Sequence, residues 1–170
     1  SSKKNVYSDS ETTILPSVFF ELATDNGFGL GVEHVPGSAD IGAGKRTRTD
    51  DDEETTGNNT ASAEVDGLTS IYLMKTFSSG FFVKAGQTST TINTNEVLAT
   101  GSVYGNVDVD GQVLGFGYSS SFDSGLFLRA SAEWTDYDDF TLISGTPDAT
   151  TATTNTIKAD VDTTAFKFAI

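Results

Sequence analysis

His34 is where any acid-base or nucleophilic chemistry in this chain would have to begin, because it is the only histidine and there is no cysteine. A Ser-His-acid hydrolase needs a serine within reach of the imidazole and an acid that orients the ring. The residues that follow, Val35-Pro36-Gly37-Ser38, place no serine two positions after His34 on the same strand face. We therefore expect no catalysis and interpret His34 as a residue near the edge of an apolar surface.

Two acidic segments could in principle bind a metal ion. The run Asp50 to Glu54 lacks the spaced carboxylates and the central glycine of a calcium loop, so it is better explained as a solvated acidic loop. Asp108 and Asp110 share one strand face, but the preceding residue on that face is the uncharged Asn106, which favours an inner or rim-facing strand edge. We expect no metal site and no cofactor.

Charged residues recur on one face of the alternating segments. Lys84 follows Gly80, and Arg129 follows Gly125, at the same spacing. Steps of two along the segments collect three acids and three bases on this face: Glu21, Glu33, Lys84, Arg129, Glu133 and Lys167. Since an isolated buried charge costs several kcal/mol, we expect these six to form a structural ion-pair network that fills a narrow interior.

Short turns and long links organise the segments that carry these charges. Asp25-Asn26-Gly27, Ser78-Ser79-Gly80 and Asp123-Ser124-Gly125 each open an alternating run, and glycine supplies the positive φ of a tight hairpin. Seven strands are predicted, at 14–23, 28–37, 63–77, 81–91, 107–122, 126–142 and 156–170. The turns alternate with long polar links near 38–62, 92–106 and 143–155. This alternation predicts one domain over 1–170, an all-β, up-and-down antiparallel barrel.

The opposite face of the same segments is apolar, which indicates a barrel that spans a membrane. The residues predicted to face lipid include Phe20, Leu30, Phe81, Val83, Leu114, Phe116, Leu126, Leu128, Phe166 and Phe168. The segment 63–77 is ambiguous, because Ile71 and Leu73 share a face with Lys75; we expect Tyr72 and Met74 to face lipid there. Six aromatic residues are expected in girdles at the membrane interfaces: Tyr72, Tyr104, Tyr118, Trp134, Tyr137 and Phe140.

The overall charge limits the classes of molecule that the protein is expected to bind. The formal net charge is -14, and the one basic cluster, Lys45-Arg46-Thr47-Arg48, runs directly into Asp50 to Glu54. Nucleic acid is therefore not an expected partner, because phosphate binding needs clustered Lys and Arg. No apolar run reaches the roughly 20 residues of a membrane-spanning helix. The absence of a signal peptide at Ser1 fits a mature or trimmed chain.

Several segments resemble the eight-stranded outer-membrane barrels of Gram-negative bacteria, a group that includes the membrane domain of outer membrane protein A and the small outer-membrane protein X and W types. The similarity lies in the openings Gly80-Phe81-Phe82-Val83-Lys84-Ala85 and Gly125-Leu126-Phe127-Leu128-Arg129-Ala130, in Gly115-Phe116-Gly117-Tyr118 and in Phe166-Lys167-Phe168. The resemblance implies about eight strands, the bacterial outer membrane, and contact with its lipid and lipopolysaccharide. The final Ile170 and the count of seven strands depart from it, so we expect a chain trimmed at both ends with an opening strand before Ser1.

Three functions follow as hypotheses. The first is a structural or adhesive outer-membrane barrel with a closed, charge-filled lumen, whose acidic loops face outward and contact extracellular proteins or phage. The second is a narrow pore or transporter of small, hydrophobic solutes on the same barrel. The third is a soluble lipocalin-like ligand-binding barrel, which predicts that Phe81, Val83, Leu126 and Leu128 are buried while Lys84 and Arg129 meet solvent. The sequence leaves the oligomeric state open.

Overall fold

Strands account for all the regular structure in the part of the chain that the computed structural model describes, residues 8–48, 57–97, 103–143 and 156–170. Their bounds are β1 Val18–Ala23, β2 Phe28–Arg48, β3 Gly57–Thr76, β4 Phe81–Val97, β5 Val107–Ser121, β6 Phe127–Tyr137, β7 Phe140–Ile143, β8 Thr156–Ala159 and β9 Asp162–Ala169. Within those ranges, no helix is long and apolar enough to cross a membrane.

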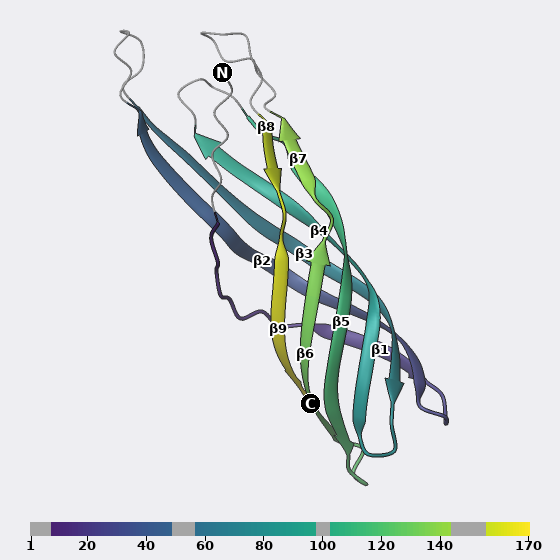
Figure 1. The fold of residues 1–170 in the computed structure, drawn as a ribbon. Helices are drawn as coiled ribbons and strands as arrows, with labels where there is room; N and C mark the ends of the chain where they lie inside the picture. The colour runs from purple at the N-terminus through teal and green to yellow at the C-terminus, as the bar shows by residue number, and fades with distance from the viewer. Residues whose placement is uncertain (1–7, 49–56, 98–102, 144–155) are drawn as a thin grey trace.

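The strands form one large antiparallel sheet in up-and-down order. Seven of them lie side by side in the order β1-β2-β3-β4-β5-β6-β9, and β7 and β8 form a separate two-stranded sheet. Figure 1 shows the large sheet as a set of long, tilted strands, with the β7–β8 pair at the end opposite the tight turns. We call the end with the tight turns the turn end and the opposite end the far end.

The three turn-end hairpins have the same backbone design, as the sequence predicts. In each, an amide donates to the carbonyl four residues ahead, and the glycine amide donates back: Thr24 N to Phe28 O and Gly27 N to Thr24 O are both 2.8 Å. The pairs Phe77/Phe81 and Phe122/Leu126 repeat this pattern. Gly27, Gly80 and Gly125 have φ of 81°, 90° and 85°. This is a type I turn closed by a left-handed residue, which suits the twist of a hairpin.

The apolar side chains alternate outward along the strands near the turn end, and polar ones alternate inward. Phe81 and Val83 are 59% and 49% exposed, whereas Lys84, which follows Val83, is only 6% exposed. The same pattern holds on β5 and β6, where Leu114, Phe116 and Leu128 are exposed. The burial required by a soluble lipocalin-like barrel is therefore contradicted.

The large sheet is strongly curled. Lys167 of β9 contacts Glu33 of β2 at 2.7 Å, although β9 is five strands away from β2 in the sheet order. Neighbouring strands are about 4.8 Å apart, so a flat sheet would separate these strands by roughly 24 Å. The contact requires the sheet to wrap around its polar face. No hydrogen-bonded ladder joins β1 to β9 in the described ranges, so the two edges are not shown to close.

Strands extend further toward the far end than the sequence predicts. The link expected at 38–62 is strand over its described parts, because β2 and β3 pair from Ser38 with Asp66 to Arg48 with Gly57. β4 likewise continues to Val97. Polar composition suggested loops there, but threonine-rich alternating segments also favour paired strands. Residues 49–56, 98–102 and 144–155 lie outside the described residues, so the acidic run Asp50 to Glu54 is not described.

Two of the predicted strands are each divided. The segment 126–142 becomes β6 and β7, and the segment 156–170 becomes β8 and β9. The breaks fall at Asp138-Asp139 and at Asp160-Val161. Aspartate is a poor strand former, which fits the position of both breaks. The Asp138 amide still donates to the carbonyl of Asp110 on β5 at 2.8 Å.

Candidate functional site

Four of the six charged residues form a closed ring of ion pairs inside the curled sheet. Lys84 Nζ lies 3.1 Å from Glu33 Oε2 and 2.5 Å from Glu133 Oε1. Lys167 Nζ lies 2.7 Å from Glu33 Oε1 and 2.8 Å from Glu133 Oε2. Each lysine therefore bridges two glutamates, and each glutamate offers one oxygen to each lysine. All the carboxylate oxygens of the ring have a cationic partner, which is the condition for burying such charges.

The other two charged residues form a second pair beside the ring. Arg129 donates through both terminal nitrogens to the two oxygens of Glu21, each at 2.7 Å. The Tyr72 hydroxyl donates to Glu21 Oε1 at 2.7 Å. The guanidinium also lies over the rings of Phe19 and Phe82, 5.0 Å from each centroid. This two-bond geometry is the strong form of an arginine-carboxylate pair. We call all six residues the ionic core.

The ionic core leaves little open space. The cavity that these side chains line, together with Phe19, Phe82 and their neighbours, has a volume of about 30 Å³. A space of that size holds about one water molecule. Three acids face three bases, so the interior has no excess charge to attract an ion. The arrangement can hold strands together, and the described side chains leave only this small space beside Lys84 and Glu133.

The structure overturns the sidedness prediction for the segment 63–77, and it does so beside the ionic core. Tyr72 and Met74 were expected to face lipid, but they are 3% and 5% exposed, while Ile71 and Leu73 are exposed. Tyr72 reaches the interior because Gly31 lies opposite it: a Cβ added at Gly31 would be 2.4 Å from the Tyr72 ring. Lys75, which made the pattern ambiguous, lies at the turn end over the Phe28 ring, 4.1 Å from its centroid.

The aromatic residues divide between the two faces. Trp134 and Tyr118 lie on the apolar outer face, where Trp134 packs on Phe116 at 5.5 Å and Tyr118 on Phe81 at 5.4 Å. The prediction that all six belong to interface girdles is wrong for the other four. Those four are buried: Tyr72, Tyr104, Tyr137 and Phe140.

Three of these buried aromatics belong to an apolar cluster at the far end, which sequence reasoning missed. Its buried members are Ile92, Tyr104, Val109, Tyr137, Phe140 and Leu142. Tyr104 lies between β4 and β5, and the Thr94 hydroxyl donates a hydrogen bond to its backbone carbonyl at 2.8 Å. Burial, and then the nearby Glu96 carboxylate, raise the pKa of the Tyr104 hydroxyl, so it stays neutral. The available signal was parity, because Tyr137 lies in step with Arg129 and Glu133 on β6.

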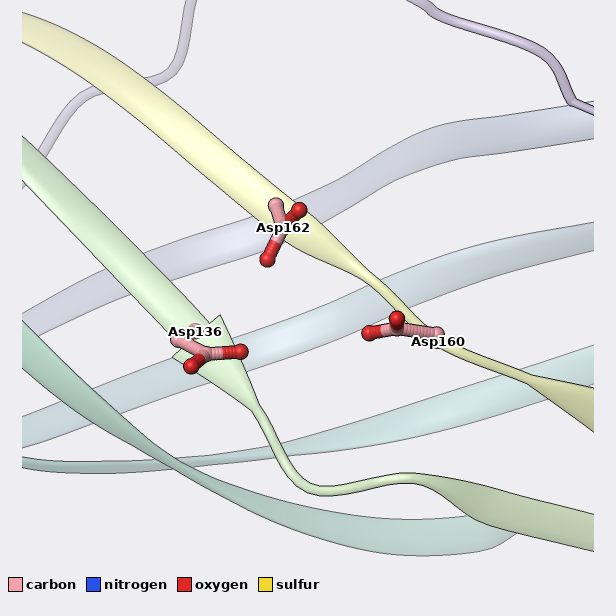
Figure 2. Close-up of side chains that lie close together, drawn as sticks. All are labelled: Asp136, Asp160 and Asp162. Carbon is pink, nitrogen blue, oxygen red and sulfur yellow. The ribbon is translucent and has the colours of Figure 1, made fainter.

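Three exposed carboxylates meet at the outside of the far end. Asp136 at the end of β6 lies directly opposite Asp162 of β9, and Asp160 adjoins them, with one oxygen of each within 4.8 Å of the others. Figure 2 shows the three side chains directed toward a common region from neighbouring segments. We call Asp136, Asp160 and Asp162 the acidic triad. Like charges in register repel one another, so the triad gives this rim a concentrated negative potential.

The remaining sequence candidates are dispersed. His34 lies exposed on β2, and its Nδ1 is 2.9 Å from the Thr69 hydroxyl; within the described residues it has no carboxylate partner. Asp108 and Asp110 are exposed on either side of the buried Val109, so they lie on the outer face near the far end. Of the two placements expected for them, inner or rim-facing, the inner one is wrong. Asp108 accepts a hydrogen bond from Thr91 Oγ1 at 2.7 Å.

The fold and the ionic core define an all-β protein whose antiparallel sheet, toward the turn end, has buried ion pairs on its inner face and apolar side chains on its outer face. No protein-family model, curated protein or solved structure matches the chain. The site geometry and the sidedness of the sheet therefore carry the functional argument.

Proposed function

We propose that this protein is a small β-barrel of the bacterial outer membrane, with a closed lumen and a structural or adhesive role at the cell surface. The observation that carries the proposal is the inverted sheet: exposed apolar side chains surround a buried ionic core. In water this arrangement would be unfavourable, because it exposes apolar side chains to solvent and buries ionised ones. In a bilayer the exposed face is solvated by acyl chains, and the interior is the place for polar groups.

The size of the apolar outer face supports the same proposal. On β6 and the turn before it, outward apolar residues run from Leu126 to Trp134, roughly 26 Å along a strand. Beyond Trp134 the outward residue is Asp136, and on β5 the outward residues change from Leu114 to Gln112 and Asp110. This run has the length of the shortest tilted strands that span a bilayer, about 9–11 residues, and the bacterial outer membrane is thinner than average. The far-end parts of the strands and the acidic triad then project outward from the bilayer.

The proposal also requires paired edges, because an unpaired strand edge is not tolerated in lipid. The curl that brings β9 to β2 supports closure, and we infer that β1 and β9 are joined directly or through an eighth strand. The proposed contacts are membrane lipid and lipopolysaccharide at the outer face, and extracellular proteins or phage at the acidic far end. We propose no catalytic role, no cofactor and no nucleic-acid partner.

Trp134 provides a direct test, because it is the only tryptophan and lies on the apolar outer face, 45% exposed. After refolding into vesicles, its fluorescence should be quenched by lipids with brominated acyl chains and protected from aqueous iodide. The matched control carries Trp134→Phe and Tyr137→Trp, which moves the indole to a buried far-end position. That variant should be quenched much less by brominated chains. Quenching of Trp134 by iodide and not by bromine would contradict the proposal.

A further inference from the structure

We propose that the far end contains a binding cavity for an amphipathic cation, meaning a molecule with an apolar body and a positively charged head. The cavity has a volume of about 530 Å³. Its apolar wall includes Ile92, Tyr104, Phe140, Leu142, Ile157 and Val161. Small-molecule sites occupy roughly 300–1,000 Å³ and are lined mainly by apolar and aromatic side chains. This site goes beyond the proposed function, and neither inference depends on the other.

The cavity is separate from the ionic core. The inward side of β4 gives the order of layers: Lys84 belongs to the ionic core, Thr88 and Thr90 follow, and Ile92 lines the cavity. The two threonines are 3% exposed. Thr88 is bonded to Ser70 at 3.0 Å, and Thr90 donates to the Asp66 carbonyl at 3.1 Å. Two buried, hydrogen-bonded threonines thus lie between Lys84 and Ile92 along β4, and the cavity shares no lining residue with the small space of the ionic core.

The charge around the cavity selects the ligand's head group. Five of the residues that line it carry a carboxylate, and no described lining residue is a lysine, arginine or histidine: Asp9, Glu11, Glu96, Asp160 and Asp162. Two of the five, Asp160 and Asp162, belong to the acidic triad, which together with Asp136 places three carboxylates on the outer side of the same rim. A cationic head is attracted to this rim while the apolar body enters the cavity, and an anionic head is repelled.

A bare metal ion does not fit the same observations. The triad carboxylates are exposed, so water competes with them for the coordination of a metal ion, and the wall that adjoins them is apolar. A divalent ion gains nothing from that wall, since it prefers oxygen ligands throughout. An apolar body gains free energy in proportion to the surface it buries, and the rim then adds charge selectivity. The occupant that uses both features is therefore an amphipathic cation.

Methyl NMR of the refolded protein in uncharged detergent tests the site residue by residue. The probes are hexyltrimethylammonium and hexyl sulfate, which share a chain and differ in head charge. We expect hexyltrimethylammonium to shift the Ile92 and Ile157 methyl signals saturably, and hexyl sulfate to leave them unchanged. Ile71, exposed on the outer face, reports partition into the micelle and should not follow the same curve. Shifts confined to Ile71, or equal responses to both probes, would overturn the proposal.

Two sets of variants separate the body from the head. Asp160→Asn with Asp162→Asn should weaken binding of hexyltrimethylammonium about fourfold or more, whereas Asp123→Asn, at the turn end, should leave it unchanged. Ala63→Phe, which fills the cavity from β3, should abolish binding while keeping the Ile71 signal of the folded protein. Ala159→Leu serves the same purpose if the larger change prevents folding. Unaltered affinity in a folded cavity-filling variant would refute the site.

Discussion

Arg129 and the two lysines of the ionic core are partnered differently. Arg129 has one acidic partner, Glu21, whereas Lys84 and Lys167 each contact both Glu33 and Glu133. Among the described residues, removing Arg129 leaves Glu21 with one neutral donor, the Tyr72 hydroxyl. An unpaired buried charge destabilises the fold by more than the intact ion pair stabilises it. Losing one member of the pair is therefore expected to be worse than losing both.

Arg129→Met should therefore lower the free energy of unfolding by about 3–5 kcal/mol. Adding Glu21→Gln should restore most of that loss, because the uncompensated carboxylate is then gone. Urea-dependent unfolding from vesicles measures both variants. Lys75→Met is the control, since Lys75 lies outside the ionic core at the turn end. Additive losses in the double variant would show that Glu21 and Arg129 are not coupled.

At the scale of elements, the hairpin turns are alike in backbone and differ in their surroundings. Gly27 and Gly125 have nearly the same φ, 81° and 85°. A Cβ on Gly27 would lie 2.2 Å from the Thr76 carbonyl oxygen, whereas nothing lies within 4 Å of one on Gly125. The first turn is thus packed against the end of β3, and the third is free of such contact.

Gly125→Ala should cost about 1–2 kcal/mol, the strain of a left-handed alanine. Gly27→Ala should cost clearly more, because the backbone of β3 must also move. The midpoints of urea unfolding, compared between the two single variants, give the difference directly. Equal midpoints would show that the backbone of β3 at Thr76 can move aside with no measurable loss of stability.

Element by element, much of the sheet could be predicted from the alternation of residue types. Turn glycines located three hairpins, and parity placed Lys84 and Arg129 inward and Phe81 and Leu128 outward. Parity was ambiguous on β3, because Lys75 shares the outer face with apolar residues and the pocket beside Gly31 that receives Tyr72 exists only after β2 and β3 pair.

The far end was harder to predict for a different reason. Its strands continue through polar sequence, and its apolar cluster is assembled from short segments of β4, β5, β6 and β7. No single segment shows that cluster. Tyr104 and Phe140 were grouped by residue type as interface aromatics, but their burial depends on long-range packing. The cross-strand pairing of Asp136 with Asp162 likewise depends on the register of β6 and β9.

At the scale of the whole molecule, the size of the interior is the feature on which the proposed closed lumen and the pore hypothesis differ. The space among the ionic core is about 30 Å³, and Lys84 and Glu133 are both buried there. A hydrated ion needs a continuous wet path, which these paired side chains occupy. The structural hypothesis and the pore hypothesis therefore predict opposite electrical behaviour.

The protein should show no conductance above leak in a planar bilayer. The variant Lys84→Ala with Glu133→Ala removes one base and one acid and leaves Lys167 bound to Glu33, so it should open a measurable path while keeping the charge balanced. The variant Lys75→Met should stay closed. Conductance of the unmodified protein well above leak would favour the pore.

The distribution of the core charges along the chain also constrains the order of assembly. The first two strands contribute only acids, Glu21 and Glu33, whereas β4, β6 and β9 contribute three bases and one acid: Lys84, Arg129, Glu133 and Lys167. In the proposed membrane barrel, an early hairpin of β1 and β2 would carry two unmatched negative charges into lipid, at a cost of several kcal/mol. If the proposal is right, we expect the beginning of the chain to insert only together with its end, so that insertion and closure form a single cooperative event.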